Sequence, residues 1–190
     1  MVIKGIQLIA ASFLLLTFAV SGVVTALMPC DGIQRRRVRI YFTHLLAKAL
    51  IKVIRVKVEF KKSAHFAGSG KLVVANHVSV LDAIVLMARA PSVFVTSTEI
   101  EEQPLIGFLA RSGGCLFVER RNRLRIEEDQ TQLRKVLLQG FDIVLFPEGT
   151  STNGTEIKRF KSGLFPAALE LRASIEPVSI RYESISGAAV

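Results

Sequence analysis

The chain has 190 residues, of which 50% are hydrophobic and 22% charged, and its mean hydropathy is +0.41. Its formal net charge is +9, and it contains two cysteines, two tyrosines and no tryptophan. This composition excludes a disordered chain and a disulfide framework, and it is too apolar for a plain soluble enzyme. We therefore expect one globular domain with a membrane segment, in a reducing compartment.

The basic excess lies at the N-terminal end. Residues 1–60 carry nine Lys or Arg and two Asp or Glu, whereas residues 61–190 carry 16 and 14. Positive charge next to apolar sequence favours an anionic membrane surface as the partner, and the scarcity of aromatic side chains argues against nucleic acid.

The first predicted element is an apolar helix over residues 6–28. No charged side chain occurs between Gly5 and Cys30. These 23 residues would form a helix about 35 Å long, enough to cross a hydrocarbon core of about 30 Å. A signal peptide is the competing interpretation, but no A-x-A cleavage site follows. The helix either spans the bilayer or enters one leaflet and returns through a turn at residues 29–32.

The second predicted element is a basic amphipathic helix over residues 35–55. A polar stripe recurs at helical spacing and comprises Arg37, Tyr41, His44, Lys48, Lys52 and Arg55. Such a helix suits a membrane surface; the alternative is a core-facing helix with a solvated basic face. Residues 1–58 are thus predicted to be a membrane anchor. The arginines after the first helix place residues 59–190 on the cytoplasmic face of an inner or cytoplasmic membrane.

From residue 60 onward, short β-rich runs alternate with helical stretches. The predicted strands are residues 72–75, 93–96, 116–118, 143–146 and 177–180, and the predicted helices are residues 79–89, 104–111, 125–138 and 162–172. This alternation predicts an α/β fold with a largely parallel sheet covered by helices.

His77 directly follows the first of these strands, at the kind of strand end where α/β folds bind ligands. Asp82 comes five residues later, across a turn into a helix. The carboxylate can fold back onto the imidazole, fix one tautomer and leave the other nitrogen as a base. Ser79-x-x-Asp82 is equally a capping box, so a catalytic dyad and a helix cap both stay open at this point. His44 and His65 are expected to be solvated structural residues.

Two further strand ends carry candidate residues. Arg120 follows the predicted strand 116–118, which contains Phe117 and begins two residues after Gly114, and an arginine there can clamp a phosphate through two parallel hydrogen bonds. Glu148-Gly149-Thr150 follows the next strand, where Glu148 can bind backbone amides or ligand and Gly149 permits close approach to an oxyanion.

Together these stretches resemble a known family. Asn-His-x-Ser-x-x-Asp, Gly-x-x-Phe-Val-x-Arg, Phe-Pro-Glu-Gly-Thr-Ser and Glu-Pro-Val occur in that order. They are similar to the four motif blocks of the glycerolipid acyltransferases, and among these to the 1-acyl-sn-glycerol-3-phosphate acyltransferases. The resemblance covers roughly residues 70–180.

The resemblance implies that His77 is the general base and Asp82 its orienting partner. Arg120, with Gly114 and Phe117 shaping its strand, would bind the acceptor phosphate; Glu148, Gly149 and Thr150 would complete the acceptor pocket, and Pro177 would lie in the acyl-donor region.

The implied activity is transfer of a fatty acyl group from acyl-CoA or acyl-carrier protein, as co-substrate, to the sn-2 hydroxyl of 1-acyl-sn-glycerol-3-phosphate, forming phosphatidic acid. No metal or other cofactor is expected. The alternatives are acylation of another lysolipid, such as a lyso-ornithine lipid or a lysophospholipid, and a catalytically silent lipid-binding membrane protein. One departure concerns the acceptor: Ser97 stands where many relatives carry a lysine.

Overall fold

The protein was analysed as a computed structural model that describes residues 2–60, 70–119, 125–185 and 188–189. Its described elements, in chain order, are α1 (Val2–Leu27), α2 (Gly32–Val53), β1 (Leu72–Ala75), α3 (Val80–Arg89), β2 (Val93–Ser97), α4 (Thr98–Glu101), α5 (Pro104–Ser112), β3 (Leu116–Val118), α6 (Ile126–Leu138), β4 (Ile143–Leu145), α7 (Phe165–Glu170), β5 (Ile175–Val178), β6 (Ser184–Ile185) and β7 (Ala188–Ala189).

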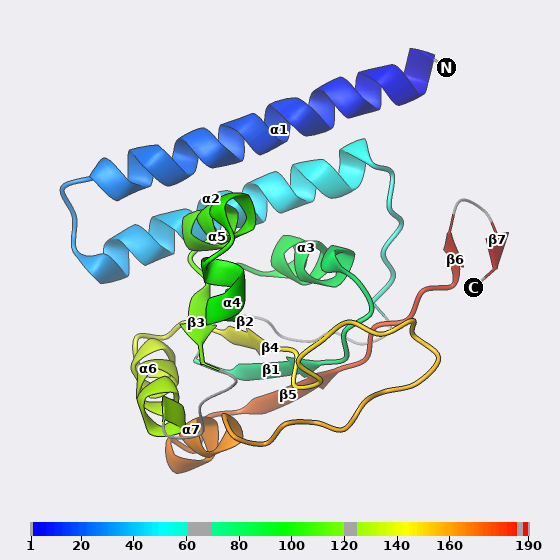
Figure 1. The fold of residues 1–190 in the computed structure, drawn as a ribbon. Coiled ribbons are helices and arrows are strands. Elements are labelled where there is room, and N and C mark those ends of the chain that lie inside the picture. Colours follow the sequence, from blue (N-terminus) through cyan, green and yellow to red (C-terminus); the bar gives the residue numbers. More distant parts are fainter. Residues whose placement is uncertain (1, 61–69, 120–124, 186–187, 190) are drawn as a thin grey trace.

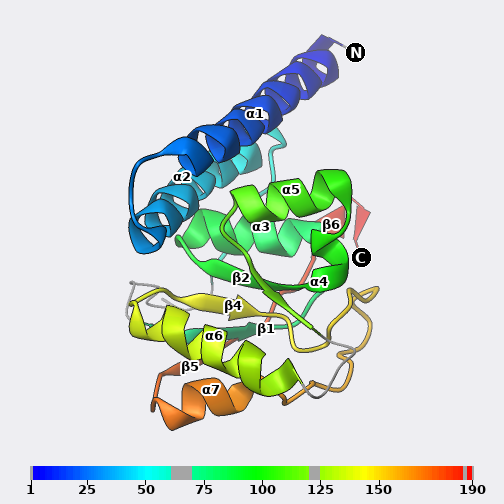
Figure 2. The same cartoon turned by 60° about the vertical axis from the view of Figure 1, so that its left-hand side comes forward.

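Strands β1 to β5 form one parallel sheet in the order β3-β2-β4-β1-β5. Helices α2 and α3 lie over one face, and α6 and α7 lie over the other (Figures 1 and 2). The predicted α/β class with a largely parallel sheet is therefore confirmed. Because all five strands run in the same direction, their C-terminal ends line up along one end of the sheet. Ligand sites of α/β folds lie at that end.

Buried side chains fill both faces of the sheet. Successive residues of a strand point to opposite faces, so Leu72 and Val74 join the core under α6 and α7, while Val73 and Ala75 join the core under α3. Near-continuous burial of β1 and β4 is typical of parallel strands covered on both sides. This rigid sheet fixes the positions of the loops that follow its strands.

Several elements differ from their predicted bounds: helix α7 spans residues 165–170 rather than 162–172, and the differences at α2 and β5 have local reasons. Helix α2 begins at residue 32 rather than 35 because the Asp31 carboxylate accepts the Gln34 backbone N–H at 2.7 Å, which caps the helix. It ends at Val53, and Arg55 has a φ of 58° in the left-handed region that ends many helices. Strand β5 spans residues 175–178 rather than 177–180, because β5 is an edge strand and tolerates Pro177 inside it.

Helix α2 packs into the domain as well as against α1. It contributes the buried Ile40 and Ala47 to the two cores. His44 was expected to be solvated but is 6% exposed, and its Nδ1 lies 2.7 Å from the Met87 carbonyl of α3. Part of the polar stripe thus faces protein, whereas Arg37 and Lys48 are exposed. His65 lies outside the described residues.

Helix α1 runs antiparallel to α2 and lies along it (Figure 1). Gln7 Nε2 donates to the Val53 carbonyl at 2.9 Å near one end, and Arg39 Nε donates to Thr25 Oγ1 at 3.0 Å near the other. Gly22 touches α5 so closely that a side chain there would collide with Ser112. Small and polar residues therefore face the protein.

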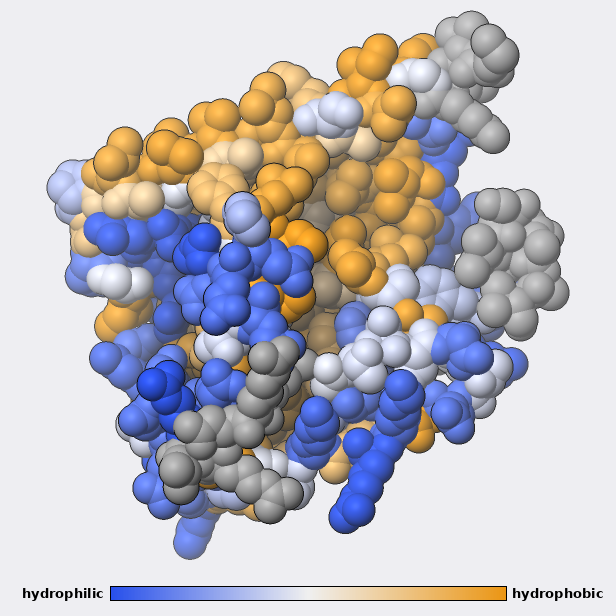
Figure 3. Space-filling view, in the orientation of Figure 1, coloured by the Kyte–Doolittle hydropathy of each residue, from blue (hydrophilic) through white to orange (hydrophobic). Residues whose placement is uncertain are grey.

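The opposite side of α1 is apolar and exposed, as the hydrophobic band across Figure 3 shows. Its exposed residues include Leu8, Ile9, Phe13, Leu16 and Leu27, each more than 60% exposed. Within the described residues, the segment Gly5–Leu27 is long and apolar enough to cross a membrane. An apolar face of this extent is unusual for a protein surface in contact with water.

Candidate active site

His77 and Asp82 lie together at the C-terminal end of β1. The imidazole Nδ1 is 3.0 Å from Asp82 Oδ2, and the carboxylate is fully buried while the imidazole is 21% exposed. An ionised carboxylate only accepts hydrogen bonds, so Nδ1 carries the proton in the neutral ring. The Nε2 atom is then the basic nitrogen, and it has no hydrogen-bond partner among the described residues.

The same carboxylate also caps α3. Asp82 Oδ2 accepts the backbone N–H of Ser79 at 2.9 Å and of Val78 at 2.6 Å, while Ser79 Oγ accepts the Leu81 N–H at 3.0 Å. This is a complete capping box. One side chain therefore makes both the hydrogen bond to His77 and the helix cap, so the cap does not exclude a catalytic role for the pair.

Burial disfavours the ionised form of Asp82, but the hydrogen bonds that the carboxylate accepts favour that form more strongly. Desolvation alone would raise the pKa of Asp82; the hydrogen bonds from His77, from Tyr182 and from the Ser79 and Val78 backbone lower that pKa below its ordinary value. The carboxylate is consequently ionised at neutral pH. A buried negative charge next to the imidazole stabilises the imidazolium that a general base becomes.

The loop that carries His77 is held by the loop after β4. Glu148 is buried, and its two carboxylate oxygens accept the backbone N–H of His77 at 2.7 Å and of Lys158 at 2.8 Å. The Thr152 N–H donates to the His77 carbonyl at 2.9 Å, and the imidazole stacks on Phe146 at 4.2 Å between ring centroids. Glu148 thus binds backbone amides, one of the two roles considered for it, and fixes the position of His77.

Gly114 and Phe117, which were expected to shape the strand before Arg120, lie farther along the sheet than the His77–Asp82 pair. Arg120 lies outside the described residues. Gly114 precedes β3 and so lies at the N-terminal ends of the strands, whereas His77 lies at their C-terminal ends. Gly114 has a φ of +79°, and a side chain there would meet Ile40 of α2. Phe117 lies within β3, which β2 and β4 separate from β1. The structure therefore does not bring Gly114 to the dyad.

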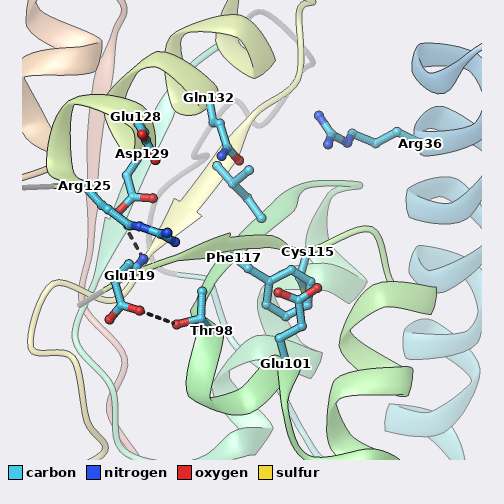
Figure 4. Close-up of a pocket in the computed structure, with 11 residues that line it drawn as sticks. Arg36, Thr98, Glu101, Cys115, Phe117, Glu119, Arg125, Glu128, Asp129 and Gln132 are labelled. Atoms are coloured by element: carbon cyan, nitrogen blue, oxygen red, sulfur yellow. Dashed lines mark hydrogen bonds between the residues drawn. The ribbon is translucent and has the colours of Figure 1, made fainter. Parts of the chain in front are cut away.

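A cavity of about 330 Å³ runs along the edge strand β3, and Phe117 lines it (Figure 4). Its charged lining residues are of both signs: Arg36, Arg125, Glu101, Glu119, Glu128 and Asp129. Thr98 Oγ1 donates to Glu119 at 3.2 Å, and the Glu119 N–H donates to Asp129 at 3.0 Å. One end of the cavity lies at the C-terminal ends of the strands, as His77 does, because Glu119 directly follows β3.

The remaining predicted site residues lie in the loop after β4 and in the edge strand β5. Gly149 has a φ of +73°, which glycine adopts without strain, and a side chain there would meet Lys161. Thr150 is exposed on the same loop. Pro177 is exposed in β5 and pairs with Val74 of β1.

Tyr182 belongs to the dyad cluster and was not among the predicted site residues. Its hydroxyl donates to Asp82 Oδ1 at 2.6 Å and lies 3.0 Å from Ser79 Oγ. Burial, followed by this hydrogen bond to Asp82, raises the pKa of Tyr182 to about 12. The one available signal was its position shortly after the last strand of the sheet, at the edge that carries the site.

Comparisons with known proteins identify relatives of this chain. A family model described as Acyltransferase matches residues 55–181. The chain is 31% identical over 142 residues to the 1-acyl-sn-glycerol-3-phosphate acyltransferase of Neisseria gonorrhoeae, covering 75% of this chain and 56% of that protein. It is 39% identical over 109 residues to the lyso-ornithine lipid O-acyltransferase of Pseudomonas aeruginosa, covering 57% of this chain and 42% of that protein.

A solved structure shares the fold. The 1-acyl-sn-glycerophosphate acyltransferase PlsC from Thermotoga maritima aligns with a TM-score of 0.65 at 19% identity, covering 90% of this chain and 70% of that one. The chain spans about half the length of the curated relatives named above.

Proposed function

Because this chain belongs to the acyltransferase family, whose model matches residues 55–181, we propose that it transfers a fatty acyl group from a thioester to the hydroxyl of a lysolipid. The observation that carries the proposal is the His77–Asp82 pair, with Nδ1 bound to a buried carboxylate and Nε2 without a partner among the described residues. A base held in one tautomer at a strand end is what deprotonation of a hydroxyl requires.

In the proposed reaction, His77 Nε2 takes the proton of the acceptor hydroxyl as its oxygen attacks the thioester carbonyl. The C–O bond forms, and Asp82 stabilises the imidazolium. When the tetrahedral intermediate collapses, the C–S bond breaks and the leaving sulfur takes the proton back from Nε2. The products are an ester and a free thiol.

The transfer is proposed to be direct, without an acyl-enzyme. Ser79 is engaged with the Leu81 N–H and the Tyr182 hydroxyl, and Nδ1 of His77 faces Asp82. Burial raises the pKa of the Cys115 thiol to about 12, so its thiolate is scarce at neutral pH. Neither side chain is paired with a base as an activated nucleophile would be.

The first candidate acceptor is 1-acyl-sn-glycerol-3-phosphate, as the Neisseria relative's name states for that protein. Arg36 and Arg125 in the β3 cavity, together with Arg120, would supply cations for a phosphate.

A second candidate is a lyso-ornithine lipid, named for the Pseudomonas relative. The mixed charge of the β3 cavity favours it, because an ornithine headgroup carries both an ammonium and a carboxylate, and Glu101, Glu119 and Glu128 line the same cavity as the two arginines. Ser97 in place of a lysine points the same way.

The hairpin of α1 and α2 is proposed to hold this site at a membrane, where a lysolipid resides. The exposed face of α1 would enter the apolar layer, while Arg37 and Lys48 of α2 stay at the polar surface. The two hydrogen bonds that hold α1 along α2 favour a helix lying in one leaflet over a helix that leaves the protein to cross the bilayer.

The test is acyl transfer by the purified protein in lipid vesicles. Acyl-CoA and acyl-carrier protein are each offered with a panel of lysolipids, and both the acylated product and the released thiol are measured. We expect transfer to a lysolipid, reduced about 10²- to 10⁴-fold in His77→Ala. Absence of transfer across the whole panel, with protein that is folded by circular dichroism, would overturn the proposal.

A further inference from the structure

A residue from the C-terminal segment reaches the buried carboxylate of the dyad. Tyr182 lies 100 positions after Asp82, yet its hydroxyl donates to Asp82 Oδ1 at 2.6 Å. A phenol has one hydrogen, and the carboxylate can only accept, so the 3.0 Å contact with Ser79 is a bond that the serine hydroxyl donates. The chain of donors therefore runs from Ser79 through Tyr182 to Asp82.

Hydrogen bonds between β1 and the chain after β5 hold this tyrosine in position. Asn76, the residue before His77, accepts the Ile180 backbone N–H at 2.6 Å and donates to the Ile180 carbonyl at 2.9 Å. These two bonds join the end of β1 to the chain just after β5, the neighbouring strand in the sheet. Tyr182 follows Ile180 by two residues and is thereby held over Asp82.

The two oxygens of Asp82 have different partners. Oδ2 accepts His77 Nδ1 and the backbone N–H groups of Val78 and Ser79, whereas Oδ1 accepts Tyr182. A donor at Oδ1 draws negative charge toward that atom and restricts rotation of the carboxylate. Charge on Oδ1 stabilises a His77 imidazolium less than the same charge on Oδ2, because Oδ2 is the atom bonded to Nδ1.

We propose that Tyr182 is a positioning residue that, through Asp82, sets the orientation and the basicity of the His77 imidazole. The inference rests on the proposed function in one respect, that His77 is the base. The link from Tyr182 to the imidazole can be measured with or without turnover. It predicts that loss of the hydroxyl strengthens the Asp82–His77 attraction and raises the pKa at which the ring titrates.

Among the described residues, the charged or titratable groups that hydrogen-bond to His77 or to its partner Asp82 come from three parts of the fold. Asp82 belongs to α3, Glu148 follows β4 and accepts the His77 backbone N–H, and Tyr182 follows β5. The pKa of Tyr182, raised to about 12 by burial and by Asp82, keeps the phenol neutral between about pH 5 and 9. Across that range a change in the titration of His77 reports the hydrogen bond and not ionisation of the tyrosine.

The experiment measures the His77 imidazole by nitrogen NMR as a function of pH in the full chain, with its signal assigned by loss in His77→Gln. Tyr182→Phe removes the hydroxyl and keeps the ring. Tyr41→Phe is the matched control, because Tyr41 is the other tyrosine and is exposed on α2. We expect the titration of His77 to move up by about 0.5 to 1 pH unit in Tyr182→Phe and to stay in place in Tyr41→Phe.

A second variant keeps the packing intact. In the Tyr41→Phe background, 3-fluorotyrosine replaces Tyr182 alone, and its more acidic phenol is a stronger donor to Asp82. The titration of His77 should then move down. In the acyl-transfer assay, Tyr182→Phe should lower kcat about 3- to 30-fold at neutral pH, shift the acidic limb of the rate profile upward and leave KM for both substrates within about twofold.

An unchanged imidazole titration in both Tyr182 variants would overturn the inference, whatever their stability or activity. Failure of the wild-type protein to acylate any lysolipid, with the NMR shifts present, would instead overturn the proposed function and leave the Tyr182–Asp82–His77 link standing.

Discussion

Replacing Asp82 by asparagine separates the two roles of one carboxylate. In Asp82→Asn the amide oxygen can take the position of Oδ2 and accept the same three N–H groups, from His77, Val78 and Ser79. The amide nitrogen then faces Tyr182, whose hydroxyl turns to accept it and donates to Ser79. The amide oxygen keeps the N–H groups of the cap, so the cap survives while the negative charge is lost; the Ser79 hydroxyl hydrogen gives up its acceptor on Tyr182.

The expected size of the effect follows from the geometry. At 3.0 Å and an effective dielectric constant of about 20, the attraction between imidazolium and carboxylate is about 5.5 kcal/mol. Partial exposure of the imidazole reduces this, and we take about 3 to 5.5 kcal/mol as the loss in the transition state. That range corresponds to a fall in kcat of about 10²- to 10⁴-fold. The unfolding free energy should fall by only about 1–2 kcal/mol, since neutral hydrogen bonds replace charged ones.

The assay is initial-rate kinetics with a lysolipid and a saturating thioester, accompanied by thermal unfolding. Asp142→Asn is the matched control, because Asp142 is equally buried and accepts the Lys71 N–H at 3.1 Å. It lies at the N-terminal ends of the strands, away from His77. We expect a loss of stability in both variants and a large loss of kcat in Asp82→Asn alone. Turnover of Asp82→Asn close to that of Asp142→Asn would show that the charge of Asp82 does not contribute to catalysis and that Asp82 is a helix cap.

Three further predictions concern the acceptor, the membrane and pH. Arg120→Ala should raise KM for 1-acyl-sn-glycerol-3-phosphate about tenfold or more and leave KM for the thioester unchanged, with Arg120→Lys recovering only part of the loss; equal effects on a lyso-ornithine lipid would count against a phosphate contact. The intact chain should resist extraction from membranes by alkaline carbonate, and deletion of residues 1–28, which retains α2 on the domain, should weaken that attachment; release of the intact chain by high salt alone would show that α1 is not embedded. The pKa of Asp82 in the folded protein lies below its ordinary value. The ionised carboxylate therefore contributes its full stability above the pKa of the unfolded state, and this stability is lost as the pH falls through the pKa of the folded state. The difference in Tm between wild type and Asp82→Asn should accordingly close below about pH 4.

The local features of this protein were predictable from the sequence. Strands β1 and β3 have the expected bounds, and α3, α5 and α6 differ from expectation by one residue at one end, because apolar runs, caps and prolines act within a few positions. The His77–Asp82 contact was predictable for the same reason, since five residues across a strand-to-helix turn leave little freedom. The short helix α4 and the strands β6 and β7 were missed, because elements of two to four residues carry almost no periodicity.

Contacts between distant parts of the chain depend on the tertiary structure. The placement of β5 next to β1 brings Asn76 to Ile180 and Tyr182 to Asp82, and the docking of α2 on α3 buries His44, whose helical spacing alone placed it on a solvated face. No short window of sequence specifies which strands become neighbours or which side of a helix meets a partner. Those choices depend on how all the apolar faces are buried together. Local sequence was therefore enough to predict the His77–Asp82 contact, whereas the surroundings of that pair follow from the assembled sheet.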